Sequence, residues 1–325
     1  MNGRIKIVAL ALALATATTI LPSFETKAAD FPKKPLAMIV AYSPGGGTDT
    51  AARVIAKYVQ PHLGQRLIIQ NKPGAGGQIG FTALANAKND GYKIGFINIP
   101  SIFMVKMLRD NVPYEMSNFE AIANIQLDPV VLTVKADSPY QTFEEFMDAV
   151  KKSPGNVNVG GDGPQSNNQL QVVVAEDKLG MDVNFVPFSG SGPAITATLG
   201  DQVVASVPSA SSATSHIQNG RLRALAVFAD ARYKYLPDVP TIKEASGVAV
   251  PTIGASMRGV AVPRGMDPAR KKIIEDAFAK VMKDPEFIAH ADKMGLPLHY
   301  MNAKDFDAYL KTAAESVESY ISLLK

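Results

Sequence analysis

The sequence predicts an α/β protein of two lobes, each a mostly parallel sheet flanked by helices, with a ligand cleft between the lobes. Short apolar runs alternate with amphipathic, helix-like segments along most of the chain, which is typical of parallel sheets covered by helices. Without a leader, roughly 300 residues remain, a length that fits two domains of ~150 residues each. Each half contains a strand, a glycine-rich polar loop and a helix in succession, and open α/β sheets bind ligands at such loops.

The first element is a leader, residues 1–28. Two basic residues precede an apolar run over 7–21, and the small residues Ala28 and Ala29 end the polar stretch that follows. This is the pattern of a secretory signal peptide cleaved near Ala28. The apolar run is shorter than the ~20 residues that a membrane span needs, and no other segment of the sequence is long and apolar enough. We therefore expect a soluble exported protein, most simply a periplasmic one.

Composition narrows the function classes. The chain contains no cysteine, so a disulfide framework, thiolate chemistry and a lipid-modified cysteine are excluded. Lysine and arginine number 33 and acidic residues 30, without a basic run. This balance gives little support to nucleic-acid or membrane-surface binding.

The next element is the first strand–loop–helix unit. The apolar run of residues 34–42 is followed by the loop Ser43-Pro44-Gly45-Gly46-Gly47 and by a segment with apolar residues at helical spacing. Glycines allow positive φ and close backbone approach, so the loop and the helix N-terminus present amide N–H groups to an anion. The sequence after Gly47 is Thr48-Asp49, which matches neither the phosphate-binding P-loop nor the dinucleotide fingerprint. The motif therefore predicts an anion site that is not a nucleotide site, and a tight turn without ligand is the alternative.

The elements after this unit define the lobes. Helix-like segments without strands fill the tail from Asp267 and are expected to pack back on the first lobe. We expect residues 29–127 and 251–325 to form the first lobe and residues 128–250 the second. Further strands are predicted at residues 66–71, 92–98, 129–134, 156–161, 182–188, 202–207 and 222–229.

Residues 157–174 echo the first unit in the second lobe. A strand again leads through a glycine-rich polar loop into a helix, with Ser166, Asn167 and Asn168 placed as cap and first-turn residues. Two such loops, one from each lobe, can face one another across a cleft.

Several motifs together resemble one family over the whole chain from about Phe31. The chain strongly resembles substrate-binding proteins of tripartite tricarboxylate transporters, the Bug or TctC type. The resemblance implies a periplasmic-binding-protein-like fold whose lobes close on a small carboxylate and deliver it to a membrane permease. It also implies a ligand held mainly by main-chain amides, hydroxyls and ordered water. The motifs are "YSPGGGTDTAARVIA", "LGQRLIIQNKPGAGGQIG", "NDGYKIGF", "VPFSGSGPAITATLGDQV", "IQNGRLRALAV", "LPDVPTIKEA" and "GVAVPRGMDP".

The resemblance implies site residues in the first lobe. Pro44, Gly45, Gly46 and Gly47 match the family's cleft loop. Asp49 matches the family aspartate and is either a ligand contact or a residue that orders its own helix, with Arg53 as partner. Further ligand candidates are Asn98 and Ser101 in "INIPS", and Tyr42 as an aromatic wall or as strand-end packing.

In the second lobe the sequence departs from the family pattern. The run of ligand candidates Gln165-Ser166-Asn167, followed by Asn168, stands where the family usually has Gly-Thr-Ser-Ser, so hydroxyls are partly exchanged for amides. Pro208, followed by Ser209, stands where family members often carry an aspartate. We expect this missing carboxylate to suit a ligand with additional negative charge or without an amino group. Ser189, after a strand, is a candidate contact or a turn residue.

An enzyme is the less favoured class. The sequence contains neither a zinc-binding H-E-x-x-H motif nor a G-x-S-x-G nucleophile motif, and its histidines are scattered. We therefore expect no catalysis, cofactor or metal, and a monomer whose partners are a small organic anion and the tripartite transporter's permease subunits. A sensor that presents the anion to a signalling receptor and, more remotely, a secreted α/β hydrolase are the alternatives. The histidines are His62, His216, His290 and His299.

Overall fold

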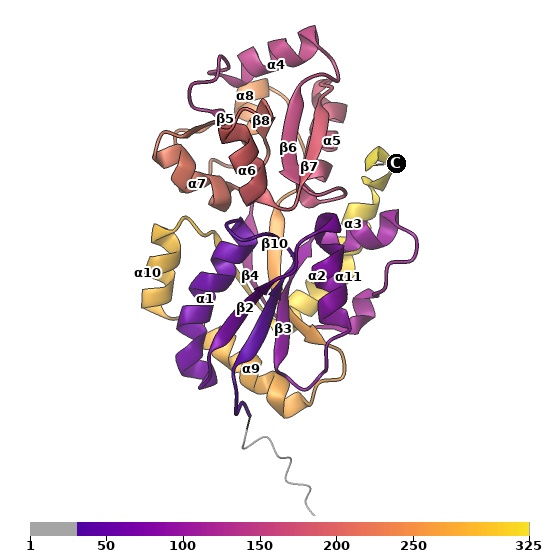
Figure 1. Cartoon of the computed structure of the whole chain (residues 1–325), viewed down its shortest axis with the longest axis vertical. Coiled ribbons are helices and arrows are strands. Elements are labelled where there is room, and N and C mark those ends of the chain that lie inside the picture. Colours follow the sequence, from indigo (N-terminus) through magenta and orange to yellow (C-terminus); the bar gives the residue numbers. More distant parts are fainter. Residues whose placement is uncertain (1–30, 325) are drawn as a thin grey trace, which may run out of the picture.

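The computed structural model describes residues 31–324, so the predicted leader at residues 1–28 lies outside it. Within the described range the chain forms two lobes that are stacked along the long axis of the molecule (Figure 1). The α/β class and the two-lobed architecture predicted from the sequence are confirmed.

Within residues 31–324, the first and last thirds of the chain form one six-stranded sheet, ordered β11-β4-β10-β3-β1-β2. β2 and β3 run parallel to β1, and β10 runs antiparallel to both β3 and β4. The strands are β1 (Leu36–Val40), β2 (Leu67–Asn71), β3 (Lys93–Ile99), β4 (Phe119–Asp128), β10 (Ser256–Pro263) and β11 (Leu298–Asn302).

The middle third forms a five-stranded sheet within the described range, ordered β7-β6-β8-β5-β9. β7 and β8 run parallel to β6, and β5 runs antiparallel to β8 and β9. The strands are β5 (Val130–Lys135), β6 (Asn158–Asp162), β7 (Asn184–Phe188), β8 (Ala205–Ser206) and β9 (Leu222–Phe228).

Both sheets are mixed, which corrects the prediction of mostly parallel sheets. The chain crosses into the second lobe between β4 and β5, and returns after β9 to begin β10. β5 and β10 therefore start at the junction and run away from it, between strands that run towards it. Alternating strands and helices predict parallel neighbours when the helix connects two strands of the same sheet. β5 and β10 instead follow a strand of the other lobe, so the rule does not apply to them. The precise domain limits at 128 and 250 stay a prediction.

Helices cover both sheets. α9 packs against α1, and α11 packs against β4, so the tail lies on the first lobe as predicted, while η4 reaches α5 of the second lobe. The expectation of a tail without strands is wrong, because β11 lies in the tail and pairs with β4. No helix within residues 31–324 combines the length and the apolarity of a membrane span. First-lobe helices are α1 (Gly47–Leu63), η2 (Ala75–Gly77), α2 (Gln78–Ala85), α3 (Ser101–Leu108), η3 (Met116–Asn118), α9 (Pro268–Val281), α10 (Pro285–Lys293), α11 (Ala303–Glu318) and η4 (Ile321–Leu324), and second-lobe helices are α4 (Phe143–Lys152), α5 (Asn167–Leu179), α6 (Ser191–Leu199), α7 (Ala210–Gln218) and α8 (Ile242–Ser246).

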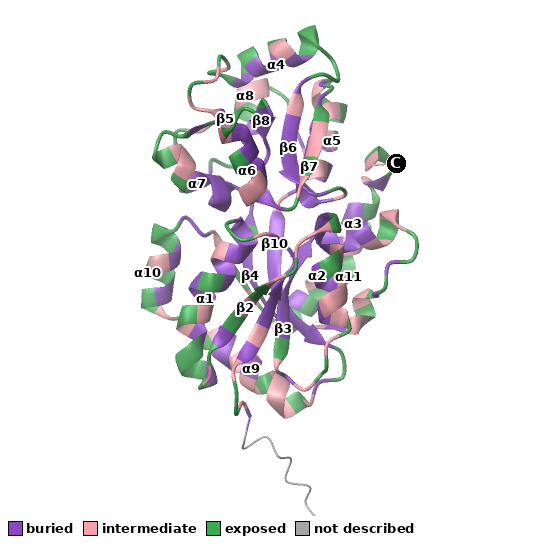
Figure 2. Cartoon of the chain, in the orientation of Figure 1, coloured by how far each residue is buried: buried purple, intermediate pink, exposed green. Residues whose placement is uncertain are grey.

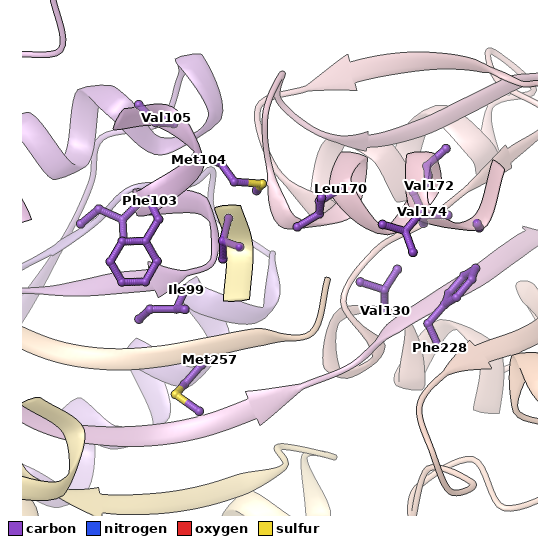
Figure 3. Packing of buried hydrophobic residues seen from close by; sticks show 14 of the residues in the cluster. Ile99, Phe103, Met104, Val105, Val130, Leu170, Val172, Val174, Phe228 and Met257 are labelled. Carbon is purple, nitrogen blue, oxygen red and sulfur yellow. The ribbon is translucent and has the colours of Figure 1, made fainter. Parts of the chain in front are cut away.

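The central strands of both sheets form the buried core. β10 is buried along its whole length, and the central strands of both lobes are mostly buried, with exposed residues concentrated on the outer helices (Figure 2). Apolar packing continues across the junction, where Met104 of α3 extends towards Leu170 of α5 (Figure 3). The loops at the strand ends are therefore carried on a rigid base in each lobe.

Candidate functional site

A polar cavity lies between the lobes, at the ends of β1, β3 and β6 and the start of β10. Its lining comes from both lobes, as the two strand–loop–helix units predicted. The lining residues are Tyr42, Gly46, Gly47, Thr48, Asn98, Asp162, Asn167, Ser191, Ser209, Ser256 and Arg258.

The helices α1, α5, α6 and α7 all begin at this cavity. Their first or capping residues, Gly47, Asn167, Ser191 and Ser209, line it. The first amides of a helix have no partner within the helix, and its dipole places partial positive charge at the same end. Helix ends from two lobes thus give one small volume a positive potential, which favours an anion.

The glycine loop owes its shape to Gly45 and Asp49. Gly45 has φ +83°, a conformation that favours glycine. The buried Asp49 carboxylate accepts hydrogen bonds from the Gly45 amide (3.0 Å), Arg53 Nε (2.9 Å) and Asn71 Nδ2 (2.9 Å). Burial alone would raise the pKa of Asp49, but the bonds from Arg53, Gly45 and Asn71 outweigh it and lower the pKa. Asp49 therefore orders the loop, with Arg53 as the partner expected from the sequence.

Gly47 lets the two lobes approach closely. A Cβ atom at this position would lie 2.5 Å from Arg258 Nη2, 2.6 Å from Ser211 Oγ and 2.7 Å from Ser209 Oγ. Real Cβ atoms do not approach other heavy atoms so closely, so a side chain here would force these groups apart. Glycine is therefore needed at position 47 because neighbouring side chains leave no room for a Cβ atom, and not because of its backbone angle.

Arg258 brings a buried positive charge to the cavity. Its side chain is 2% exposed, its Nε donates to Thr48 Oγ1 (3.0 Å), and its Nη1 donates to Gln126 Oε1 (3.2 Å) and pairs with Asp128. Asp128 also accepts from the Ser211 amide (3.1 Å) and hydroxyl. A buried ion pair is stable only when such further bonds satisfy it. This chain of contacts links the start of α1 to the start of α7 in the other lobe.

Asp162 brings a carboxylate to the cavity from the end of β6. Its Oδ1 accepts a hydrogen bond from Ser191 Oγ (2.8 Å). Burial raises the pKa of Asp162 to about 6, assisted by the charge of Asp128 and opposed by Ser191 and Arg258. The carboxylate is therefore close to its protonation midpoint in mildly acidic solution.

Asn98 contributes an unsatisfied acceptor. Its Nδ2 donates to Thr48 Oγ1 (2.9 Å) and Ser256 Oγ (3.3 Å). Its Oδ1 is buried and accepts no hydrogen bond from any described residue. Buried polar atoms are normally paired, so this oxygen marks a position where a donor is expected.

The sequence-predicted residues fall into three groups. Tyr42, Gly46, Gly47, Asn98, Asn167 and Ser209 line the cavity. Pro44, Gly45, Gln165 and Ser189 are not among the lining residues and are not fully buried. Asp49, Ser101, Ser166 and Pro208 lie behind the lining and hold it. Contact of any of them with a ligand remains a prediction.

The supporting residues have defined partners. Ser101 Oγ accepts from the Asn167 amide (3.0 Å), which joins α3 to α5 across the junction. Ser166 caps α5 by accepting from the Gln169 amide (3.3 Å). The Pro208 carbonyl accepts from the Val131 amide (3.0 Å), and therefore positions β5 next to the start of α7.

Sequence reasoning missed the charged residues of the site. Arg258 stands alone in an apolar strand, and Asp162 ends a strand inside a glycine-rich loop; both were visible as isolated charges. Thr48, Ser191 and Ser256 were also missed. Pro208 leaves the position of the family aspartate without a carboxylate, but Asp162 brings one to the cavity from the end of β6.

The lobes are closed over the cavity, whose volume of about 10 Å³ holds no more than about one water molecule. Ser43 Oγ donates to Ser189 Oγ (2.8 Å), and Arg109 Nη2 donates to the Pro164 carbonyl (2.9 Å), so both contacts join the lobes. A larger surface hollow of about 680 Å³ lies within the second lobe, away from these helix ends. A small organic anion therefore needs the lobes to separate before it enters.

Comparison with known proteins identifies the family and solved structures of similar fold. Residues 51–324 match the model of the tripartite tricarboxylate transporter family receptor. Protein BugT of Bordetella pertussis is 32% identical over 280 residues, covering 82% of this chain and 81% of BugT. The structure of the periplasmic binding protein BugD superposes with a TM-score of 0.82 at 27% identity, covering 90% and 97% of the two chains. MatC from Rhodopseudomonas palustris, solved with bound malate, gives a TM-score of 0.77 at 25% identity and covers 91% of this chain and 100% of MatC.

Proposed function

Since the chain belongs to the receptors of the tripartite tricarboxylate transporter family, we propose that it is a periplasmic receptor that captures a small organic anion, most simply a carboxylate, and delivers it to a membrane permease. Carboxylate solute binding is supported at the family level by the malate bound to MatC.

One observation carries the anion proposal: helix N-termini from both lobes meet around a single cavity, next to Arg258. Hydrogen bonds to a charged acceptor contribute ~1.5–3 kcal/mol each. Three or four of them suffice for micromolar affinity, about 8 kcal/mol. Gly46, Gly47, Thr48 and Arg258 supply donors in the first lobe, and Asn167 and Ser191 begin the facing helices.

The proposed mechanism is closure of the two lobes on the anion. The chain crosses between the lobes at Pro129 and again in the segment between Phe228 and Ser256, and rotation about these crossings opens the cleft. The ligand binds donors of both lobes at once only when the lobes close around it, so it selects a closed arrangement whose cleft is wide enough to hold it. The closed form is then the one that the permease recognises.

Thermal unfolding against a ligand panel tests this function. The panel contains mono-, di- and tricarboxylates, aromatic acids, sulfonates, amino acids and nucleotides. A ligand at a hundred times its dissociation constant stabilises the native state by about 2.7 kcal/mol, which raises the melting temperature clearly. We expect a rise with carboxylates, and a rise with nucleotides alone would contradict the proposal.

Two glycine-to-alanine variants test whether the ligand binds in the cavity between the lobes. Gly47→Ala places a methyl group against Arg258, Ser209 and Ser211, and should abolish the ligand-induced rise. Gly200→Ala, at φ −94° with its nearest neighbour at 3.4 Å, should keep the rise. An unchanged rise in Gly47→Ala would place the ligand elsewhere.

Delivery and catalysis are tested separately. Uptake of the identified ligand by cells should require this receptor together with the permease subunits, and uptake that persists without the permease would favour a sensor. The pure protein should return the ligand chemically unchanged, and turnover would revive the hydrolase alternative.

A further inference from the structure

We propose that the cleft selects carboxylates that also carry a hydroxyl or amino group, and that Asp162 is the residue that recognises this second group. The inference rests on the proposed function and names the ligand class more narrowly. It departs from the expectation, based on Pro208, of a ligand without an amino group.

The cavity holds acceptors that no described residue satisfies. Asp162 Oδ1 accepts from Ser191 Oγ, but its Oδ2 accepts no hydrogen bond within residues 31–324. Asn98 Oδ1 is likewise unsatisfied. Asp162 is 9% exposed and Asn98 is 2% exposed, and they line the same cavity from opposite lobes. A ligand that offers only acceptors would leave both oxygens unpaired, which costs free energy.

Hydroxyl groups of the protein do not fill this need. Ser191 Oγ has one proton, which it donates to Asp162 Oδ1, while the same oxygen accepts from the Ser209 amide (3.2 Å). Ser209 Oγ is paired with Ser212 Oγ (2.8 Å). Neither serine therefore has a proton left for the second oxygen of Asp162, which leaves that oxygen open to a donor group of a ligand.

Donors for the carboxylate are present in the same cavity. Arg258 Nη2 donates to no described residue and faces Gly47. Thr48 Oγ1 accepts from both Arg258 and Asn98, so its own proton is free to be donated. The cavity thus presents free donors around Gly47 and free acceptors at Asp162 and Asn98, which is complementary to a carboxylate that carries a hydroxyl or amino group.

Isothermal titration with matched acid pairs tests the inference. The pairs are malate and succinate, aspartate and succinate, lactate and propionate, and citrate and tricarballylate; the second acid of each lacks the donor. We expect the wild-type protein to bind the donor-bearing member of at least one pair tenfold or more tightly than its partner. Equal or weaker binding of every donor-bearing acid would overturn the inference without any variant.

Asp162→Asn assigns the selectivity to its residue. The amide keeps an oxygen for Ser191 and turns an NH₂ group, a donor, towards the ligand, so the preference should fall to about twofold or reverse. Asp177→Asn, an exposed matched change on α5, should keep the wild-type preference. A preference that survives Asp162→Asn would overturn the role of this residue.

The outcomes separate the two proposals. Binding of carboxylates without regard to the donor would leave the receptor function standing and remove this inference. Failure of every acid in the panel to bind would overturn both.

Discussion

At the scale of single residues, the site is a balance of buried charges. Arg258 is paired with Asp128, and Asp162 adds a further carboxylate that accepts a hydrogen bond from the Ser191 hydroxyl. Ionised groups without a compensating partner are costly in a protein interior. Asp162 therefore works against folding when it is ionised.

The pH dependence of stability should reveal this cost. The pKa of Asp162 in the folded state is about 6, above the ordinary value of 3.8, so the folded state binds the proton more tightly than the unfolded state. The contribution is small below about pH 4, lowers the free energy of unfolding as pH rises from about 4 to about 6, and stays nearly constant above that. Asp162→Asn removes it, and the variant should gain about 2 kcal/mol relative to wild type between pH 4 and pH 7.5.

Urea unfolding at both pH values, without added ligand, measures this change. Asp177→Asn serves as the control and should follow the wild-type protein at each pH. A constant difference between Asp162→Asn and wild type across this range would show that Asp162 is not held in a poorly solvated position.

Sequence reasoning reached these residues unevenly, for physical reasons. Asp49 and Arg53 are four positions apart on one helix, so their pairing follows from helical spacing. Arg258 and Asp128 lie 130 positions apart and meet only because β10 pairs with β4. Contacts of this kind depend on which strand lies beside which, and no local pattern encodes that order.

At the scale of elements, the starts of the helices were the predictable part. Glycine-rich and polar loops before α1 and α5 indicated helix N-termini at a cleft, and both line it. The direction of β5 and β10 was not predictable, because these strands continue from one lobe into the other. The contacts that hold the lobes together were also missed, since they join loops that are remote in sequence.

Arg109 at the end of α3 forms one such contact, and its removal should weaken binding. Its Nη1 donates to the Ala75 carbonyl (2.8 Å) in the first lobe, and its Nη2 donates to the Pro164 carbonyl (2.9 Å) in the second. The bond to Pro164, and a further bond from Nε to Gln165 Oε1, cross between the lobes and are lost when the lobes separate. The side chain is partly exposed, so we discount the loss to about 1 kcal/mol, a roughly fivefold rise in the dissociation constant of the ligand.

Titration of Arg109→Ala with the ligand measures the dissociation constant, and stopped-flow kinetics measure the dissociation rate. We expect a faster dissociation rate to account for most of the rise in the dissociation constant. Lys106→Ala is the matched control, because Lys106 lies on the same helix and pairs with Glu115 inside the first lobe. Equal effects of the two substitutions would mean that Arg109 does not act by joining the lobes.

At the scale of the whole molecule, the small cavity and the contacts across the junction require a cycle of opening and closing. A cavity of about 10 Å³ does not admit even a three-carbon acid, so the receptor must open to load. The apolar packing in each lobe is rigid, and the backbone crossings are few, so the lobes should move as bodies rather than deform.

Distance measurement between labels on the two lobes tests this motion directly. Because the chain contains no cysteine, the pair Lys152→Cys and Lys280→Cys can be labelled without side reactions, and both positions are exposed, on α4 and α9 respectively. Addition of a carboxylate that binds should narrow the distribution of distances between the two labels and shift it towards shorter distances, as expected when the lobes close. The control pair Lys57→Cys and Lys280→Cys lies on the packed helices α1 and α9 of one lobe and should not change. If both pairs stay constant while the ligand binds, the anion enters by local movement of the glycine loop, and hinge closure cannot be the signal that the permease reads.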